Sequence, residues 1–361
     1  MRLKPTALCE RLGVRLPIFG FSHSADVVVE IARAGGFGVL GLARELPHEL
    51  PGIIERVEAR LDGLPYGVDL MLPGNVPASG DLAALRAGLP PAHVDFVRGL
   101  SDRFQIASAT RPGFFTEQVR SEALFEEQID LVLGSRANLV ATAIGIREGL
   151  ISRAKAAGKV TASLVGSTRH ARKALGMGVE VLVAQGYDAG GHTGPIGTMS
   201  LLPQIVEIAG DRPVLGAGGI ATGGQVVACL AMGAQGAWLG TLWMAARESH
   251  TPPALLRKLV AGGSEDTVIT RAHSGKPCRV IRSEWIDAWS APGAPEPLGM
   301  PAQQALTGEA FTAMHEHGDE RVIYEAAGQS VFAITGQTSV AQQMQTLVSQ
   351  AEERLAALCR P

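Results

Sequence analysis

One histidine stands in a glycine-rich segment where few other side chains could act on a ligand. Residues 185–194 read Gln-Gly-Tyr-Asp-Ala-Gly-Gly-His-Thr-Gly, directly after the apolar run 179–184, which predicts a buried strand. Glycines leave room for a flat ligand, and an imidazole can transfer protons near neutral pH. We therefore expect His192 to be a catalytic base or a substrate contact, with Asp188 orienting or charging its ring. His23, which follows the first predicted strand, is a second catalytic candidate.

Two further turns have the composition of a phosphate site. Gly216-Ala-Gly-Gly-Ile220 follows one apolar run, and Leu239-Gly-Thr241 follows the next. Backbone N–H groups without a neighbouring Cβ can approach a phosphate closely, and a helix beginning near Gly223 would add partial positive charge. The alternative interpretation is a pair of tight turns that bind nothing.

The elements that must position these residues alternate between apolar runs and amphipathic segments. Eight runs without polar alternation predict strands buried on both faces, at Leu16–Gly20, Phe37–Leu42, Tyr66–Leu70, Leu139–Ala143, Val160–Leu164, Val179–Ala184, Pro213–Ala217 and Gly236–Gly240. Helices are predicted between them, for example at Ala25–Ala34, Ile146–Ala157, Ser167–Met177 and Gly223–Met232. This order favours an α/β fold of the (β/α)8 TIM-barrel type, whose active site lies at the carboxyl ends of the strands. A doubly wound parallel sheet is the alternative.

Composition limits the classes of partner. The chain has 361 residues, 46% of them hydrophobic, and a formal net charge of −3, which gives no electrostatic reason to expect nucleic acid or an anionic membrane. The four cysteines are widely spaced, so we expect neither a structural metal site nor a disulfide framework. With no signal-like N-terminus and no long apolar segment, the expectation is a cytoplasmic protein with a small-molecule substrate, and a homodimer is compatible with the sequence.

Two segments interrupt the barrel pattern. Residues 73–128 are too long for one loop and include a strand-like piece at Phe104–Ser108, while the part beyond Thr251 is mostly helical, with a Pro-rich linker at Ala291–Pro301. We expect the two segments to pack together as a side domain or lid, although they could instead decorate the outside of the barrel. The predicted division is a barrel of residues 1–72 and 129–250, a helical side domain or lid of 73–128 and 251–326, and a closing loop and helix of 327–361.

Several of these segments resemble those of a known family. Asp188-Ala-Gly-Gly-His-Thr-Gly with Gln185-Gly186, and the two phosphate-type turns, resemble the nitronate monooxygenase family, also called 2-nitropropane dioxygenases. Further matches are Ala34-Gly-Gly-Phe-Gly38, Ser274-Gly-Lys-Pro-Cys-Arg-Val-Ile-Arg282 and Ala327-Gly-Gln-Ser-Val331.

The resemblance implies FMN at the mouth of the barrel and a reaction in which a nitroalkane or nitronate and O2 give a carbonyl compound and nitrite. The phosphate would lie on Gly218, Gly219, Gly240 and Thr241, and His192 would be the base. The residues expected around FMN are Gly20, Phe21, Ser22, Asp69, Gln185, Gly190, Gly191, Gly194, Ala217, Gly218, Gly219, Gly240, Thr241, Gly328, Gln329 and Ser330.

Three departures from the family pattern affect the expected site. Gly20-Phe21-Ser22-His23 stands where the family usually has Ala-Pro-Met, and Asp69 stands where it commonly has Asn. An ionised Asp69 could not donate a hydrogen bond to the flavin. The third departure is the long insertion, which would reshape the substrate pocket.

Other functions remain open. An NAD(P)H-dependent FMN reductase of the enoyl-thioester or quinone type shares the Gly-Gly-His-x-Gly loop, and a relative acting on an acyl thioester could use the insertion to cover a long substrate. A flavin-binding sensor without turnover is a third class. Residues 216–224 lack an acidic ribose partner at the usual spacing, so no NAD(P)H site is recognisable.

Overall fold

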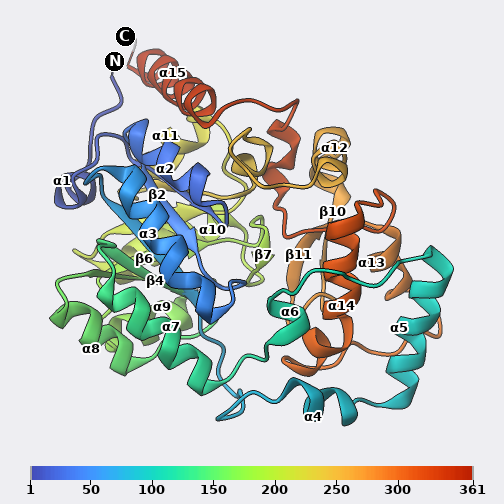
Figure 1. Ribbon diagram of the computed structural model, residues 1–361. Coiled ribbons are helices and arrows are strands. Elements are labelled where there is room, and N and C mark those ends of the chain that lie inside the picture. Colours follow the sequence, from blue (N-terminus) through green and yellow to red (C-terminus); the bar gives the residue numbers. More distant parts are fainter. Residues whose placement is uncertain (1, 360–361) are drawn as a thin grey trace.

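A closed barrel of eight parallel strands forms the centre of the molecule (Figure 1). The computed structural model describes residues 2–359. In barrel order the strands are β1 (Ile18–Ser22), β2 (Phe37–Gly41), β3 (Tyr66–Met71), β4 (Leu139–Ala143), β5 (Val160–Val165), β6 (Val181–Gln185), β8 (Val214–Ala217) and β9 (Ala237–Leu239). Pairing of β1 with β9 closes the ring, with Phe19 opposite Trp238. The predicted TIM barrel is therefore confirmed, and the doubly wound alternative is wrong.

The strand predictions are confirmed to within two residues at each end. Both faces of these strands are buried because their alternate side chains meet different partners. Val181 and Val183 of β6 point into the barrel, whereas Leu182 points outward to the surrounding helices. A strand with two apolar environments has a continuous apolar sequence, which is why the runs are recognisable.

The helices that surround the barrel follow the strands in sequence. They are α2 (Ala25–Arg33), α3 (Leu50–Leu61), α7 (Glu122–Gly134), α8 (Glu148–Ala156), α9 (Thr168–Gly176), α10 (Thr198–Ala209), α11 (Gly223–Ala231) and α15 (Val340–Leu358). The last of them, α15, packs against α11 and α2. It therefore takes the place of an eighth barrel helix, although about a hundred residues separate it from β9.

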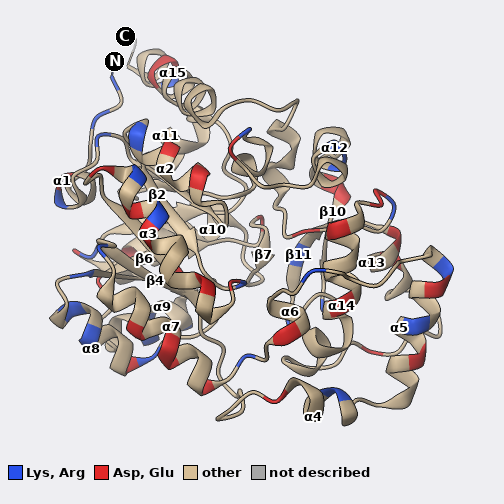
Figure 2. Cartoon of the chain, viewed as in Figure 1, with Lys and Arg blue, Asp and Glu red and all other residues tan. Residues whose placement is uncertain are grey.

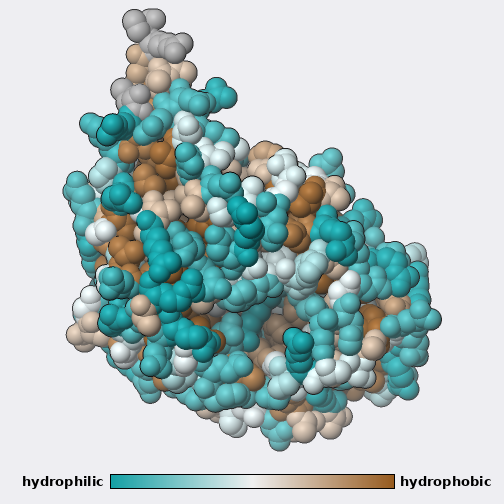
Figure 3. Space-filling model, turned by 45° about the horizontal axis from the view of Figure 1, so that its top comes forward, coloured by the Kyte–Doolittle hydropathy of each residue, from teal (hydrophilic) through white to brown (hydrophobic). Residues whose placement is uncertain are grey.

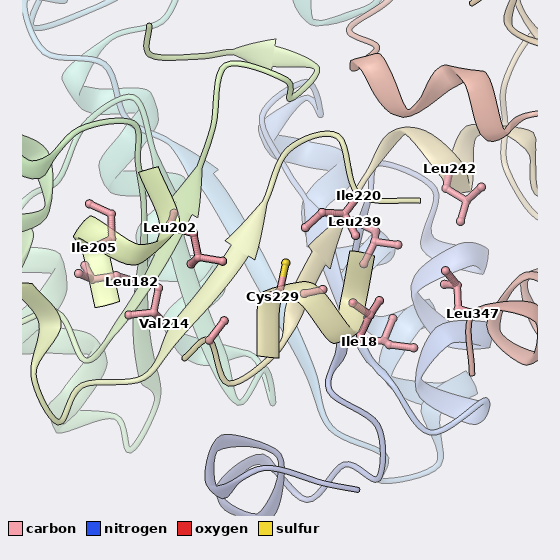
Figure 4. Close-up of a cluster of buried hydrophobic side chains, with 14 of the residues drawn as sticks. Ile18, Leu182, Leu202, Ile205, Val214, Ile220, Cys229, Leu239, Leu242 and Leu347 are labelled. Carbon is pink, nitrogen blue, oxygen red and sulfur yellow. The ribbon is translucent and has the colours of Figure 1, made fainter. Parts of the chain in front are cut away.

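The outward-facing strand side chains and these helices form one core. Ile18, Leu182 and Val214 of the strands lie against Leu202 of α10 and Leu347 of α15 (Figure 4). All five are at most 2% exposed. At the amino-terminal end of the barrel, the short helix α1 (Ala7–Leu12) buries its apolar side chains in the cluster that fills the barrel interior. This end is closed, and the opposite end is free to form a site.

A side region lies next to the barrel (Figure 1). It contains α4 (Leu82–Ala87), α5 (Pro91–Phe104), α6 (Phe114–Glu117), α12 (Pro253–Ala261), α13 (Glu284–Ala288) and α14 (Ala302–His317), with the short turns η1 (Pro47–Glu49), η2 (Thr241–Ala245), η3 (Ser264–Asp266) and η4 (Gln329–Ala333) nearer the barrel. Helix α14 packs against α4, α5 and α6, so the inserted and the C-terminal segments lie together. That this region acts as a lid stays a prediction.

Three details of the side region differ from expectation. The insertion ends earlier than residue 128, because Ser121 caps α7 by accepting a hydrogen bond from the Leu124 amide, and α7 packs on α3 and α8 as a barrel helix. The strand expected at Phe104–Ser108 is wrong: α5 extends to Phe104, which is buried, and Gln105 ends it in the left-handed conformation. The C-terminal part also contributes β10 (Thr267–Thr270) and β11 (Cys278–Ile281) to a three-stranded sheet, in which β11 pairs with β10 and with β7 (Gly191–His192) of the glycine-rich loop.

The surface has no single-sign face in the view of Figure 2, where acidic and basic side chains are interspersed over most elements. Figure 3 shows a mainly hydrophilic surface with scattered hydrophobic patches. Among residues 2–359, no helix combines the length and the apolar character needed to cross a bilayer.

Candidate flavin and substrate site

A cavity of about 820 Å³ lies at the carboxyl ends of the barrel strands, with the side region forming its remaining walls. Ligand pockets for organic molecules commonly have volumes of roughly 300–1,000 Å³. The predicted cofactor residues that line it are Phe21, Ser22, Asp69, Gln185, Gly190, Gly191, Gly194, Ala217, Gly218, Gly219, Gly240, Thr241 and Ser330. Their contact with FMN stays a prediction.

The turn after β8 has the geometry of an anion-binding site. Gly218 and Gly219 have φ angles of 102° and 70°, a conformation that side chains with a Cβ rarely adopt. Within residues 2–359, neither of their amides donates to a protein acceptor. Successive free N–H groups in such a turn form a concave site for an oxyanion.

The helix that follows this turn, α11, leaves fewer free amides for an anion than the sequence suggested. The Gly223 amide at the start of α11 donates to Gln350 Oε1 of α15 at 2.9 Å, and Gln225 completes a capping box with Thr222. A Cβ on Gly223 would lie 2.2 Å from the Leu347 carbonyl oxygen. Because α15 lies against the first residue of this helix, that residue's amide is not free to bind an anion, and a contribution of the helix to a phosphate site stays a prediction.

His192 reaches the cavity from strand β7, which is anchored to the side region. Its backbone pairs with Cys278 of β11, and the Gln185 side chain donates to its carbonyl oxygen at 3.2 Å. The ring Nε2 lies 2.7 Å from Ser274 Oγ. Burial, followed by the charges of His273, Arg120, Lys276 and Arg44, lowers the pKa of His192 well below its ordinary value. The imidazole is therefore neutral at physiological pH, and neutral imidazole is the form that accepts a proton.

The role predicted for Asp188 is wrong. Its Oδ2 accepts a hydrogen bond of 2.7 Å from the Thr198 amide at the first turn of α10, and its side chain makes no hydrogen bond to His192. A carboxylate is stabilised at a helix N-terminus by the free amides and the helix dipole. The group that orients His192 is Ser274, 82 residues further along the chain.

Three predicted cofactor residues do not line the cavity. Gly20 faces outward, because alternation along β1 turns Phe19 and Phe21 inward, and a Cβ at Gly20 would meet Ile31 and Trp243. Gly328 donates its amide to Thr241 Oγ1 at 2.9 Å. Gln329 donates its amide to the Asp188 carbonyl oxygen at 2.9 Å. Gln329 is thus hydrogen-bonded to the glycine-rich loop, whereas Gly328 is bonded to the turn after β9 and packs against Gly190.

The glycines around His192 are needed for backbone packing as well as for an open face. A Cβ at Gly190 would lie 2.6 Å from the Gly328 amide nitrogen, and one at Gly194 would lie 2.4 Å from the Gly166 carbonyl oxygen. Gly191 has a φ of 82°. The composition of the loop therefore reflects close approach to two neighbouring segments.

Asp69 and His23 lie in the cavity wall as expected, but both are shifted toward their neutral forms. Asp69 is 5% exposed, and burial raises its pKa to about 7. A protonated Asp69 can donate a hydrogen bond, which an ionised one cannot. Burial and the Arg44 charge lower the pKa of His23 to about 4, and its Nδ1 lies 2.9 Å from the Gly41 carbonyl oxygen.

Several polar residues of the cavity were not predicted. Arg44, after β2, forms a two-pronged ion pair with Glu325, whose pKa is held well below its usual value by that guanidinium although burial opposes this. His273 is 7% exposed and its ring lies 6.4 Å from that of His192. Arg120 comes from the insertion and is 2% exposed. Ser274 and His273 could have been found from the sequence, because they lie in or beside the Ser274–Arg282 motif. No sequence motif identified Arg44, Arg120 or Glu325 as cavity residues.

Comparisons with known proteins agree with this geometry. Residues 11–350 match the family model of nitronate monooxygenase. A Mycobacterium tuberculosis protein described as a monooxygenase is 38% identical over 318 residues, which cover 84% of this chain and 83% of that protein. A Rhodococcus jostii protein, named (3aS,4S,5R,7aS)-5-hydroxy-7a-methyl-1-oxo-octahydro-1H-indene-4-carboxyl-CoA dehydrogenase, is 29% identical over 313 residues, or 86% of this chain and 74% of that protein. The solved structure of nitroalkane oxidase from Streptomyces ansochromogenes has a TM-score of 0.81 and 26% identity, covering 98% of this chain and 100% of that one.

The barrel, the anion-binding turn and these relatives together define an enzyme, an oxidoreductase of the flavin type. Because the family model covers nearly the whole length, the chain belongs to the nitronate monooxygenase family.

Proposed function

We propose that the protein is an FMN-dependent nitronate monooxygenase that oxidises alkyl nitronates and nitroalkanes with O2 to a carbonyl compound and nitrite. The observation that carries the proposal is that one cavity combines the neutral imidazole of His192 with the free amides of Gly218 and Gly219. A base and a cofactor phosphate site in one cavity are what oxidation at an acidic C–H requires.

The cavity residues fit a mononucleotide flavin. The amides of Gly218 and Gly219 would hold the phosphate, with Gly240 and Thr241 beside them, and Gln185 and Asp69 line the same cavity. When bound, FMN supplies the electron transfer that no side chain of this chain can perform.

His192 would take the proton α to a nitro group. When Nε2 carries the ring proton it donates to Ser274 Oγ, which leaves the lone pair of Nδ1 available as the base. Because burial and nearby positive charges oppose protonation of the ring, His192 serves best for carbon acids that are already activated. The charges of Arg120 and Lys276 would also stabilise a nitronate anion once it has formed.

Anaerobic reduction of the yellow holoprotein tests the proposal. Bleaching of the flavin absorbance by an alkyl nitronate, without NADH or NADPH, is the expected result. Bleaching by a pyridine nucleotide alone would instead support an FMN reductase, and the absence of bleaching by nitronate, pyridine nucleotide and acyl-CoA would support a flavin-binding protein without turnover.

A relative acting on an acyl thioester is the second candidate. It is favoured by the similarity to a carboxyl-CoA dehydrogenase and by a cavity large enough for more than a small nitroalkane. Flavin bleaching by an acyl-CoA under the same anaerobic conditions, with none by nitronates, would select this function.

A further inference from the structure

His273 is a buried histidine whose ring nitrogens form no hydrogen bond within residues 2–359. It is 7% exposed and lies next to His192, with 6.4 Å between the two ring centres and 45° between the ring planes. Nδ1 is enclosed by protein without a partner, whereas Nε2 is not enclosed. Because His273 lines the cavity, Nε2 is the ring nitrogen that borders the space open to a substrate.

The surroundings of His273 would suit an apolar ring. Its imidazole packs edge to face against Phe311 and Tyr324, whose ring centres lie 5.3 and 5.7 Å away. Glu325, which acts on its charge, is paired with Arg44. A phenylalanine could fill this place without the cost of burying unpaired nitrogens. A buried imidazole without partners therefore indicates that its cavity-side nitrogen meets a ligand.

The protonation of His273 follows from the same surroundings. Burial, and then the charge of Arg44, lower its pKa to about 4, so the ring is neutral at physiological pH. A neutral imidazole carries one N–H and one lone pair. Enclosed N–H groups without an acceptor are rarer than enclosed lone pairs without a donor, so the hydrogen belongs on Nε2. His273 then presents an N–H donor to the cavity, whereas His192 presents the lone pair of Nδ1.

The backbone on both sides of His273 is fixed. Ser274, the next residue, is fully buried, and its Oγ lies 2.7 Å from His192 Nε2. On the other side, the Gln303 side chain donates to the Ala272 carbonyl oxygen at 2.9 Å. The two imidazoles are thus positioned before a substrate binds, which is the condition under which a donor and a base act most effectively.

We propose that His273 is a second catalytic residue, which donates a hydrogen bond from Nε2 to a nitro oxygen of the substrate while His192 removes the α proton. The C–H bond breaks, its proton goes to Nδ1 of His192, and its electron pair forms the C=N bond as negative charge moves onto the nitro oxygens. A fixed donor at the atoms that gain charge stabilises the transition state. This inference rests on the proposed function, since it takes a nitro group as the reacting group.

Binding of a nitroalkane that cannot react tests the hydrogen bond without turnover. The probe is the tertiary nitroalkane 2-methyl-2-nitropropane, which has no α hydrogen, added to the holoprotein with and without a heavy-nitrogen label. The isotope-edited infrared difference spectrum then isolates the nitro stretches of the bound probe. We expect the asymmetric stretch to lie at a lower frequency than for the probe in an apolar solvent. Lack of binding, or an unshifted stretch in the saturated wild type, would overturn the proposal.

Two replacements of His273 separate the donor from the ring. His273→Phe keeps an aromatic ring and removes the N–H, and His273→Gln places an amide N–H near the position of Nε2. The lowered frequency should be lost in the first variant and largely kept in the second. His48→Phe is the matched control, since His48 is exposed on η1 and does not line the cavity. A frequency that stays lowered in His273→Phe would overturn the assignment, and His273→Met, which also lacks a donor, replaces that variant should it fail to fold.

Turnover shows whether the hydrogen bond is catalytic. We expect His273→Phe to lose roughly 10²-fold in kcat with nitroethane, and His273→Gln to recover most of the loss. The isotope effect of α-deuterated nitroethane on kcat/KM should be larger in His273→Phe, because proton removal becomes slower than the other steps. An unchanged kcat and isotope effect in that variant would refute a catalytic role. Failure of every nitro compound to be turned over, with the frequency shift present in the wild type and lost in His273→Phe, would refute the proposed function and leave the donor to a bound nitro group standing.

Discussion

The carboxyl of Asp69 gives the chain a stability that depends on pH in a direction opposite to that of most aspartates. It lies on β3, points into the barrel and is 5% exposed. No hydrogen bond to it is formed by a side chain or amide of the described residues, and burial raises its pKa from an ordinary 3.8 to about 7. The perturbation to make is Asp69→Asn, which keeps the shape and removes the titration.

The magnitude follows from the difference between the two pKa values. Between pH 3.8 and about 7 the folded state binds a proton that the unfolded state has lost, so the free energy of unfolding falls as the pH rises. At about 1.36 kcal/mol per pH unit, the loss amounts to roughly 4 kcal/mol once both states are ionised. The stability is fully present below pH 3.8 and is lost as the pH passes through 7. With an unfolding entropy of about 2.1 cal/mol/K per residue over 361 residues, this corresponds to about 5 °C in Tm.

Thermal unfolding of flavin-free wild type and Asp69→Asn between pH 4.5 and 8.5 measures the effect, because a bound cofactor would change the surroundings of the carboxyl. The two proteins should have similar Tm values at the acidic end, and the variant should gain about 5 °C on the wild type by pH 8.5. Asp62→Asn is the control, since Asp62 is exposed and its left-handed backbone accepts asparagine. A Tm difference that does not change with pH would refute the reasoning that burial alone sets the protonation of Asp69.

Three further predictions test the base, the phosphate turn and the buried ion pair. His192→Asn should keep its flavin but lose about 10²- to 10⁴-fold in turnover of a neutral nitroalkane, measured by O2 uptake, while a preformed nitronate is affected much less; equal losses on both would contradict a role as base. Gly219→Asp should purify without flavin absorbance, because φ is 70°, the added Cβ would lie 3.0 Å from that of Asp188, and the carboxylate would repel a phosphate; normal flavin content would remove this turn from the site. Arg44→Met should lower the free energy of unfolding in urea by about 3 kcal/mol by leaving Glu325 unpaired, and adding Glu325→Leu should recover part of the loss; no recovery would argue against the ion pair as the cause.

Sequence reasoning located the barrel because each strand has two apolar environments. The continuous runs at Phe37–Leu42 and Leu139–Ala143 correspond to β2 and β4 almost residue for residue. Gly35 and Gly233 have φ angles of 94°, the left-handed conformation in which a glycine commonly follows a helix. These features depend on local chemistry, so they are readable from neighbouring residues. The strand expected at Phe104–Ser108 failed because a short apolar piece is equally suited to the end of a helix.

Sequence reasoning located cavity-lining residues that the barrel presents, but it missed contacts made over long sequence separations. His192, Gly218 and Gly219 could be recognised because a loop after a barrel strand must face the cavity. The partner of His192 could not, since Ser274 reaches it only through the pairing of β7 with β11. Asp188 was predicted to be the partner because it lies close to His192 in the sequence. Its carboxylate instead accepts a hydrogen bond from the Thr198 amide.

Cofactor binding and substrate selection are expected to depend on different parts of the chain. Residues expected to hold the cofactor come mainly from barrel strand ends, whereas Arg120, Ser274, His273 and Glu325 come from the inserted and C-terminal segments. Because the barrel core is packed independently of the side region, substitutions in those segments can change which substrate is accepted without disturbing the phosphate turn. It follows that membership of the family predicts the flavin chemistry of this chain better than it predicts the substrate. When relatives with different substrates are compared, the charge of the cavity-lining residues from the side region is therefore more informative than the barrel motifs.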